Sequence, residues 1–244
     1  MKAKHFLPLV VLLGAFFSCN VRTVKSPKIA QLDAKSFLKN ISHKDEVFVG
    51  SFKFDSTYDI IRFNDQRGGF TDVLNDGSQN CIVCRYDTAT LGIIWVTVIM
   101  GKGDREKATQ AIVDAAHNAV YVMGYFQDTA IFPSNDTANH QFRIASHGGI
   151  DMFVVKYAYD TGILQWVTSG GGAEDDVLIE LSNGQLIEAT KLTLDSGIVH
   201  ATACFGGQCY FGDTAVVADS TGSLLRVGYD GNQGLLKDVS RIKL

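Results

Sequence analysis

The chain alternates between apolar runs of strand length and short polar breaks, and one arrangement of the two recurs. In Asp151–Thr168, two apolar runs flank a polar segment that contains a glycine, a pattern typical of a β-hairpin. Cys81–Thr97 follows the same pattern, and Leu225–Lys237 follows it in weaker form. We therefore expect at least three β-hairpins built on one plan.

Two aromatic positions keep a constant spacing in the first two hairpins. Tyr86 and Tyr157 are 71 residues apart, and so are Trp95 and Trp166. In both hairpins the second run carries the same Trp-Val-Thr sequence. We expect these four side chains to pack in the core between neighbouring sheets.

A second recurring block precedes each hairpin and is rich in aromatic and β-branched residues. Its three copies are Val47–Phe52, Tyr121–Phe126 and, more loosely, His200–Phe205. Block, loop, hairpin and return strand together make about four strands, which is the signature of a propeller blade. The strand Met152–Tyr157 is apolar on both faces, as expected for a sheet packed between two others.

The middle unit resembles the bacterial β-propeller repeat often called SBBP. That family's pattern is Tyr-Val-x-Gly-x-Phe, then Gly-Gly-x-Asp-x-Phe-Val-x-Lys-Tyr, then Gly-x-x-x-Trp, then Gly-Gly-x-x-x-Asp. It matches the chain at Tyr121–Phe126, Gly148–Tyr157, Gly162–Trp166 and Gly171–Asp176. The resemblance implies a propeller fold on an exported, often lipid-anchored protein, and it implies no shared activity.

The match is good over this one unit, fair over Gly50–Val113 and poor after about Val177. The third unit has Ala203 where the others have glycine, and Asp238 where the others have tryptophan. We predict an all-β, propeller-like array of about three antiparallel blades over residues 46–244. Propellers usually close with four to eight blades, so three leave alternatives open: closure by the N-terminal strand, an open arc, or a second copy that completes the ring.

The N-terminus has the features of an export signal. Lys2 and Lys4 precede the 12-residue apolar run Phe6–Phe17, which is too short to span a bilayer as a helix. The run ends at Ser18 and Cys19, an arrangement that resembles the bacterial lipobox. We expect a signal peptide over residues 1–18, lipidation at Cys19, and a polar tether with one short helix over residues 19–45. The protein would then be anchored at the outer membrane or cell surface of a bacterium, the alternative being plain secretion.

Bulk charge excludes one class of partner. The net charge is −4 and the basic residues are scattered, so we expect no nucleic-acid binding and no membrane contact beyond the lipid anchor.

The cysteines of the repeat region fall into two pairs. Cys81 and Cys84 lie on one predicted strand about 10 Å apart and point to opposite faces, so we expect both to be structural and buried. Cys204 and Cys209 flank a Gly-Gly turn, and an exported location permits a local disulfide between them. Two reduced core cysteines are the alternative.

Two glycine-rich loops carry acidic residues at equivalent points, since Asp104 and Asp175 are 71 residues apart. Turns between blades are the plainer interpretation, and Asp175 with Asp176 is the one calcium candidate. No nucleophile, histidine-pair or phosphate-loop motif is present, so we predict no catalytic residue, no cofactor and no other metal site.

These observations favour a surface-tethered, non-enzymatic β-propeller module that binds a protein or glycan or acts as a scaffold. The alternative is a hydrolase or lyase on the same scaffold. It requires Asp104, Asp114, Asp175 and Asp176 to converge on one pocket at the central channel.

Overall fold

The computed structural model describes residues 27–32, 46–53, 57–64, 70–74, 78–103, 105–138, 140–180, 186–188, 190–219 and 222–242. This part of the chain is built almost wholly of strands, with one turn of 3₁₀ helix, η1 (Ala115–His117). The prediction of an all-β, largely antiparallel fold is confirmed. No helix in the described ranges is long and apolar enough to cross a membrane.

The strands form four packing layers, each of which is one side of an apolar core. The first layer has the order β1-β3-β4 and the second β2-β5-β6, while the third runs β7-β8-β9-β10 and the fourth β13-β14-β17-β18. Their bounds are β1 (Ile29–Leu32), β2 (Val47–Lys53), β3 (Ile60–Asn64), β4 (Phe70–Leu74), β5 (Gln79–Tyr86), β6 (Ile93–Gly101), β7 (Lys107–Asp114), β8 (Ala119–Pro133), β9 (Gln141–Ala158), β10 (Leu164–Gly172), β13 (Lys191–Asp195), β14 (Ile198–Phe205), β17 (Ser223–Asp230) and β18 (Leu236–Arg241). Two further hairpins are β15 (Gln208–Phe211) with β16 (Thr214–Val217), and β11 (Leu178–Glu180) with β12 (Leu186–Glu188).

Three hairpins share one register. Tyr86 pairs with Ile93, Tyr157 with Leu164, and Tyr229 with Leu236, and each pair adjoins an irregularity in the ladder. The third hairpin, which resembles the others weakly in sequence, thus has the same backbone geometry.

In each of the last two layers, a hairpin extends to the preceding layer and pairs with the last strand of that layer. We call this hairpin the arm of the layer. β8 and β9 bend where Asp128 adopts a positive φ of 65°, and their outer halves continue as a hairpin whose edge pairs with the end of β6. In the fourth layer, β15 and β16 are the arm, and β15 pairs with Gly170–Gly172 of β10. Through these contacts the second and third layers and the β15–β16 hairpin form one hydrogen-bonded sheet of nine strands.

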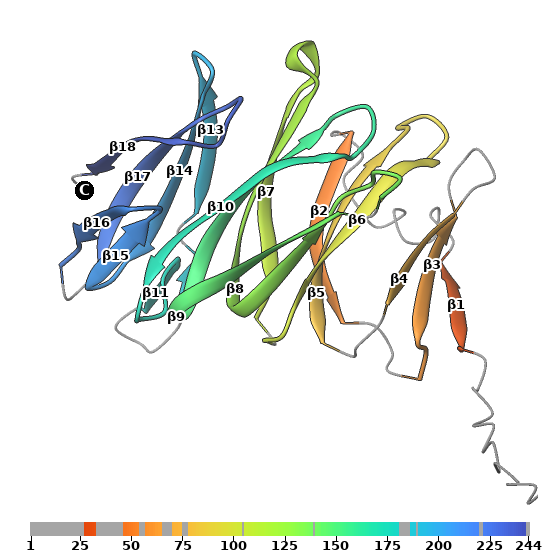
Figure 1. Cartoon of the computed structure of the whole chain (residues 1–244), viewed down its shortest axis with the longest axis horizontal. Coiled ribbons are helices and arrows are strands. Elements are labelled where there is room, and N and C mark those ends of the chain that lie inside the picture. The colour runs from red at the N-terminus through yellow and green to blue at the C-terminus, as the bar shows by residue number, and fades with distance from the viewer. Residues whose placement is uncertain are drawn as a thin grey trace, which may run out of the picture.

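Apolar clusters fill the three spaces between the layers. Ile61 and Phe63 of β3 meet Ile82 and Tyr86 in the first space. The third layer is buried on both faces, because alternate residues of β9 belong to the second and third clusters. Figure 1 shows the layers side by side in a row, from β1 at one end to β18 at the other. The row is open, and no closed propeller ring is evident among the described residues.

The strand β1 differs from expectation. Residues 29–32 lie in the predicted tether, where we expected a short helix, and they form a strand paired in parallel with β3. The backbone N–H and C=O groups along the edge of β3 need hydrogen-bond partners, which an extended segment can supply and a helix cannot. The β3–β4 hairpin thus resembles the arms of the later layers. The arm of the third layer pairs with β6 and that of the fourth pairs with β10, and β1 occupies the corresponding position beside β3.

Candidate functional site

Two buried carboxylates, Asp151 and Asp176, lie where the end of β10 meets the arm of the fourth layer, and we call this region the β10–β15 joint (Asp151 and Gly170–Asp176 with Gly206–Phe211). Glycine is required here because β15 passes very close to β10. A Cβ on Gly170 would lie only 2.2 Å from a ring carbon of Phe211, and one on Gly172 would collide with the carbonyl oxygen of Gln208. The Gly-Gly-Gly sequence therefore serves close strand packing.

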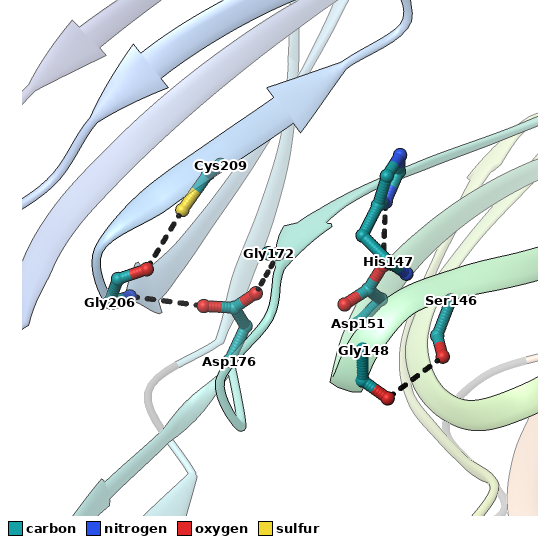
Figure 2. Close-up of polar contacts among 8 residues, drawn as sticks. All are labelled: Ser146, His147, Gly148, Asp151, Gly172, Asp176, Gly206 and Cys209. Atoms are coloured by element: carbon teal, nitrogen blue, oxygen red, sulfur yellow. Dashed lines mark hydrogen bonds and ion pairs between the residues drawn. The ribbon is translucent and has the colours of Figure 1, made fainter.

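Asp176 ties the two sides of the joint together. Its side chain is buried, its Oδ2 accepts a hydrogen bond from the Gly172 N–H at 2.7 Å, and its Oδ1 accepts one from the Gly206 N–H at 3.0 Å (Figure 2). Burial is the main cause that raises the pKa of Asp176, to about 7, against the two N–H donors that favour the charged form. The charges of Asp151 and Glu174 raise it further.

Asp151 is the second buried carboxylate of the joint. Its Oδ2 accepts hydrogen bonds from the backbone N–H of His147 at 2.8 Å and is 2.9 Å from that residue's Nδ1 (Figure 2). Its Oδ1 is buried with no hydrogen-bond partner among the described residues. Burial raises the pKa of Asp151 above its usual value. The His147 ring, 37% exposed, stacks on Tyr210 with centroids 5.4 Å apart.

Asp175 and Asp176, the calcium candidates, have different surroundings. Asp175 is half-exposed, forms an ion pair with Arg105 at 3.1 Å, and accepts a hydrogen bond from the Ile150 N–H, whereas Asp176 is buried and bound to backbone N–H groups. Within the described residues, no group of three or more His, Cys, Asp and Glu side chains comes together as a metal site would require. The structure thus gives the calcium hypothesis no support.

The predicted disulfide between Cys204 and Cys209 is not formed, and both thiols are free. Sequence reasoning placed the two cysteines across one hairpin. The Gly206–Gly207 turn instead leads from β14 in the fourth layer to β15, which pairs with β10, so the cysteines belong to different sheets. The Cys209 thiol donates to the Gly206 carbonyl oxygen at 3.3 Å (Figure 2).

A similar joint lies between the second and third layers, and it depends on a residue that sequence reasoning missed. Glu106 is buried, and its Oε1 accepts a hydrogen bond from the Gly103 N–H at 3.2 Å. Burial raises its pKa to about 7, while hydrogen bonds from backbone groups, including that of Gln127, oppose the shift. Glu106 and Asp176 are 70 residues apart, so a search at the constant spacing of 71 residues pairs Asp175 with Asp104 and overlooks Glu106. Asp104 lies outside the described residues.

The repeated tryptophans join neighbouring layers. Trp95 Nε1 donates to the Tyr159 carbonyl oxygen at 2.8 Å, and Trp166 Nε1 donates to the Gly231 carbonyl oxygen at 3.3 Å. Both rings are buried, as are Tyr86 and Tyr157, and Trp95 packs against Tyr157 with centroids 6.1 Å apart. Cys81 and Cys84 are buried on opposite faces of β5.

A groove of about 740 Å³ runs along the edges of β2 and β7. Its lining mixes apolar and polar residues: Glu46, Val47, Phe48, Val49, Tyr86, Thr109, Gln110, Ala111, Ile112, Val113, Ala115, Tyr159 and Leu192. On one side the Tyr159 hydroxyl donates to Glu46, and on the other the Leu192 N–H donates to Gln110. This concave surface combines apolar and hydrogen-bonding groups, as ligand sites do.

Of the acidic residues named for the enzyme alternative, the three that the structure describes do not converge, because Asp114 lies far from Asp175 and Asp176. Asp114 ends β7 and contacts His117 at 2.8 Å. Its partner on β8 is Ala119, whereas Asp151 pairs with Phe126, seven residues further along. At about 3.3 Å per residue, Asp114 is ~23 Å from the β10–β15 joint.

Comparison with family models, with curated proteins and with solved structures found no match. Function must therefore be argued from the geometry above. The predicted signal peptide over residues 1–18 and the predicted lipidation site Cys19 lie outside the described residues.

Proposed function

We propose that the protein is a surface-tethered, non-enzymatic module with a propeller-like, open array of blades, and that it binds a protein segment or a glycan. The shared hairpin register, the stacked layers and the arms that join each layer to the one before it support the blade interpretation. The buried acids support a non-enzymatic role, because backbone N–H groups occupy both oxygens of Asp176 and the Oε1 of Glu106.

The observation that carries the binding proposal is the groove along β2 and β7. Apolar side chains such as Val49 and Ile112 lie beside the amide of Gln110 and the carboxylate of Glu46. An extended ligand with apolar and hydrogen-bonding groups fits this lining. The proposed ligand site thus lies on the strand edges of the array, away from the joints.

The groove is tested by a matched pair of substitutions. Val113 lines the groove and Val217 lies on β16 outside it, and both are exposed, at 38% and 69%. We expect Val113→Arg to abolish retention of the ligand in a glycan array and in surface cross-linking on intact cells, because a long cation fills the groove. Val217→Arg should retain binding. Equal binding by both variants would rule the groove out as the ligand site.

The surface tether is proposed from Cys19 and is tested separately. Replacing Cys19 by Ser removes the thiol that would carry the acyl chains, so the protein should move from the membrane fraction to the soluble exported fraction. Fractionation followed by immunoblotting measures this. A Cys19→Ser protein that still sediments with membranes would contradict lipid anchoring.

A further inference from the structure

The two buried carboxylates of the β10–β15 joint, Asp151 and Asp176, both lie next to the α-carbon of Gly171. Asp151 Oδ1 and Asp176 Oδ2 are both within 2.6 Å of the point that a Cβ on Gly171 would occupy. The two oxygens are therefore about 5 Å apart or closer, a distance at which two buried negative charges repel each other strongly. Neither side chain is exposed to solvent.

Other titratable groups face the pair from every side, and none of them supplies a buried cation. His147 on β9 contacts the outer oxygen of Asp151. On the loop after β10, Glu174 adds negative charge, while Asp175 is neutralised by Arg105 from the loop before β7. From β14 and β15 come the thiols of Cys204 and Cys209, and burial raises the pKa of both.

We propose that Asp151 and Asp176 together bind one proton, and that this proton strengthens the joint between the third and fourth layers under mildly acidic conditions. A shared proton removes one of the two charges. It also gives the Oδ1 of Asp151, which has no partner among the described residues, a role in hydrogen bonding. The inference concerns the array itself and holds whatever ligand occupies the groove.

A metal ion explains the pair less well than a proton does. Backbone N–H groups occupy both oxygens of Asp176 and the Oδ2 of Asp151. One free carboxylate oxygen falls far short of the six to eight oxygen ligands that Ca²⁺ takes.

The preceding layer provides a precedent for the neutral form. Asn80 on β5 is equivalent in position to Asp151 on β9. Asn80 precedes Cys81, which pairs with Ile99 of β6. Asp151 likewise precedes Met152, which pairs with Gly170 of β10. Asn80 is also buried. The chain thus already uses an uncharged amide at one of the two equivalent positions.

The sign of the pH effect follows from the geometry and from the raised pKa of both groups. The folded state retains a proton that the unfolded state releases near pH 4. The stabilisation that this proton contributes is therefore fully present below that pH and is lost as the pH rises through about 7. We expect the Tm of the full-length protein to fall by several degrees from pH 5 to pH 8. Glu106 contributes with the same sign, so the test rests on the difference between variants.

The decisive variant is Asp151→Asn, which keeps an acceptor for the His147 N–H and places an amide donor towards Asp176. Its Tm should depend less on pH than that of the wild type, and at pH 8 it should be at least as high. Asp219→Asn, at an exposed carboxylate paired with Arg241, is the control and should leave the pH dependence unchanged. In ¹³C spectra of the wild type, one aspartate carboxyl should titrate above pH 6, and that titration should be altered in Asp151→Asn.

Three results would overturn the proposal. The first is a wild type in which every aspartate carboxyl titrates below pH 5. The second is a pH dependence that disappears in His147→Gln and persists in Asp151→Asn, because the imidazole would then be the titrating group. The third is a Tm at pH 8 that rises with Ca²⁺ in the wild type and not in Asp151→Asn, which would make the pair a cation site.

Discussion

At the scale of single residues, the glycines of the hairpin turns pack against the repeated tryptophans. Gly162 and Gly234 have positive φ values of 72° and 69°, and each lies beneath the indole ring of the preceding layer, Trp95 and Trp166 respectively. A Cβ on Gly234 would come within 2.7 Å of the Trp166 ring. The turn residue is therefore constrained both by its backbone and by the packing between layers.

A matched pair of glycines separates these two constraints. Gly212 has a φ of 58° and nothing within 4 Å of the position of a Cβ, so Gly212→Ala should cost only the left-handed strain, about 1 kcal/mol. Gly234→Ala should cost about 2–3 kcal/mol, because Trp166 must also move. Urea unfolding of both variants measures the difference. Equal losses would mean that the indole does not hold the turn.

At the scale of elements, the hairpins could be predicted because their signals are local. Period-two alternation and the fixed spacing from Tyr157 to Trp166 are visible in a short window. The arms could not be predicted, since the outer half of β9 is largely polar and is stabilised by pairing with β8. The outer half of β8, the other strand of this arm, pairs with the end of β6, about 30 residues earlier in the chain.

The joints were predicted only in part. The glycine-rich loops and Asp176 were found from their composition. Glu106 was missed because it lies 70 residues before Asp176, one residue fewer than the spacing of the repeated aromatic residues. The role of Asp151 depends on burial, which its exposed-looking sequence context of His147, Gly148 and Gly149 conceals. The Cys204–Cys209 pairing failed for a related reason, because a Gly-Gly turn can leave a sheet as well as reverse a strand.

At the scale of the whole molecule, the poor sequence match of the fourth layer has a physical explanation. Residues that face the third layer remain apolar, among them Val199, Ala203 and Leu225. The changes fall on the outer face. The third layer has Met123, Val154 and Trp166 at the positions where the fourth has Thr202, Arg226 and Asp238, as the registers show.

This outer face of the fourth layer is more polar than the corresponding face of the third layer. Arg226 and Asp238 carry charge where a following layer would require an apolar surface, and burying them unpaired would cost several kcal/mol. We therefore expect the wild-type protein to be monomeric, as an open arc that a second copy does not complete.

Restoring the apolar face should change that state. The triple variant Thr202→Met, Arg226→Val and Asp238→Trp gives the fourth layer the residues of the third, so an uncovered apolar face should drive self-association. Multi-angle light scattering should show a monomer for the wild type and for the polar control Thr202→Ser, Arg226→Lys and Asp238→Asn, and a concentration-dependent oligomer for the triple variant. Circular dichroism establishes that each protein is folded. A wild-type dimer, or a folded triple variant that stays monomeric at high concentration, would show that the polarity of this face does not control self-association.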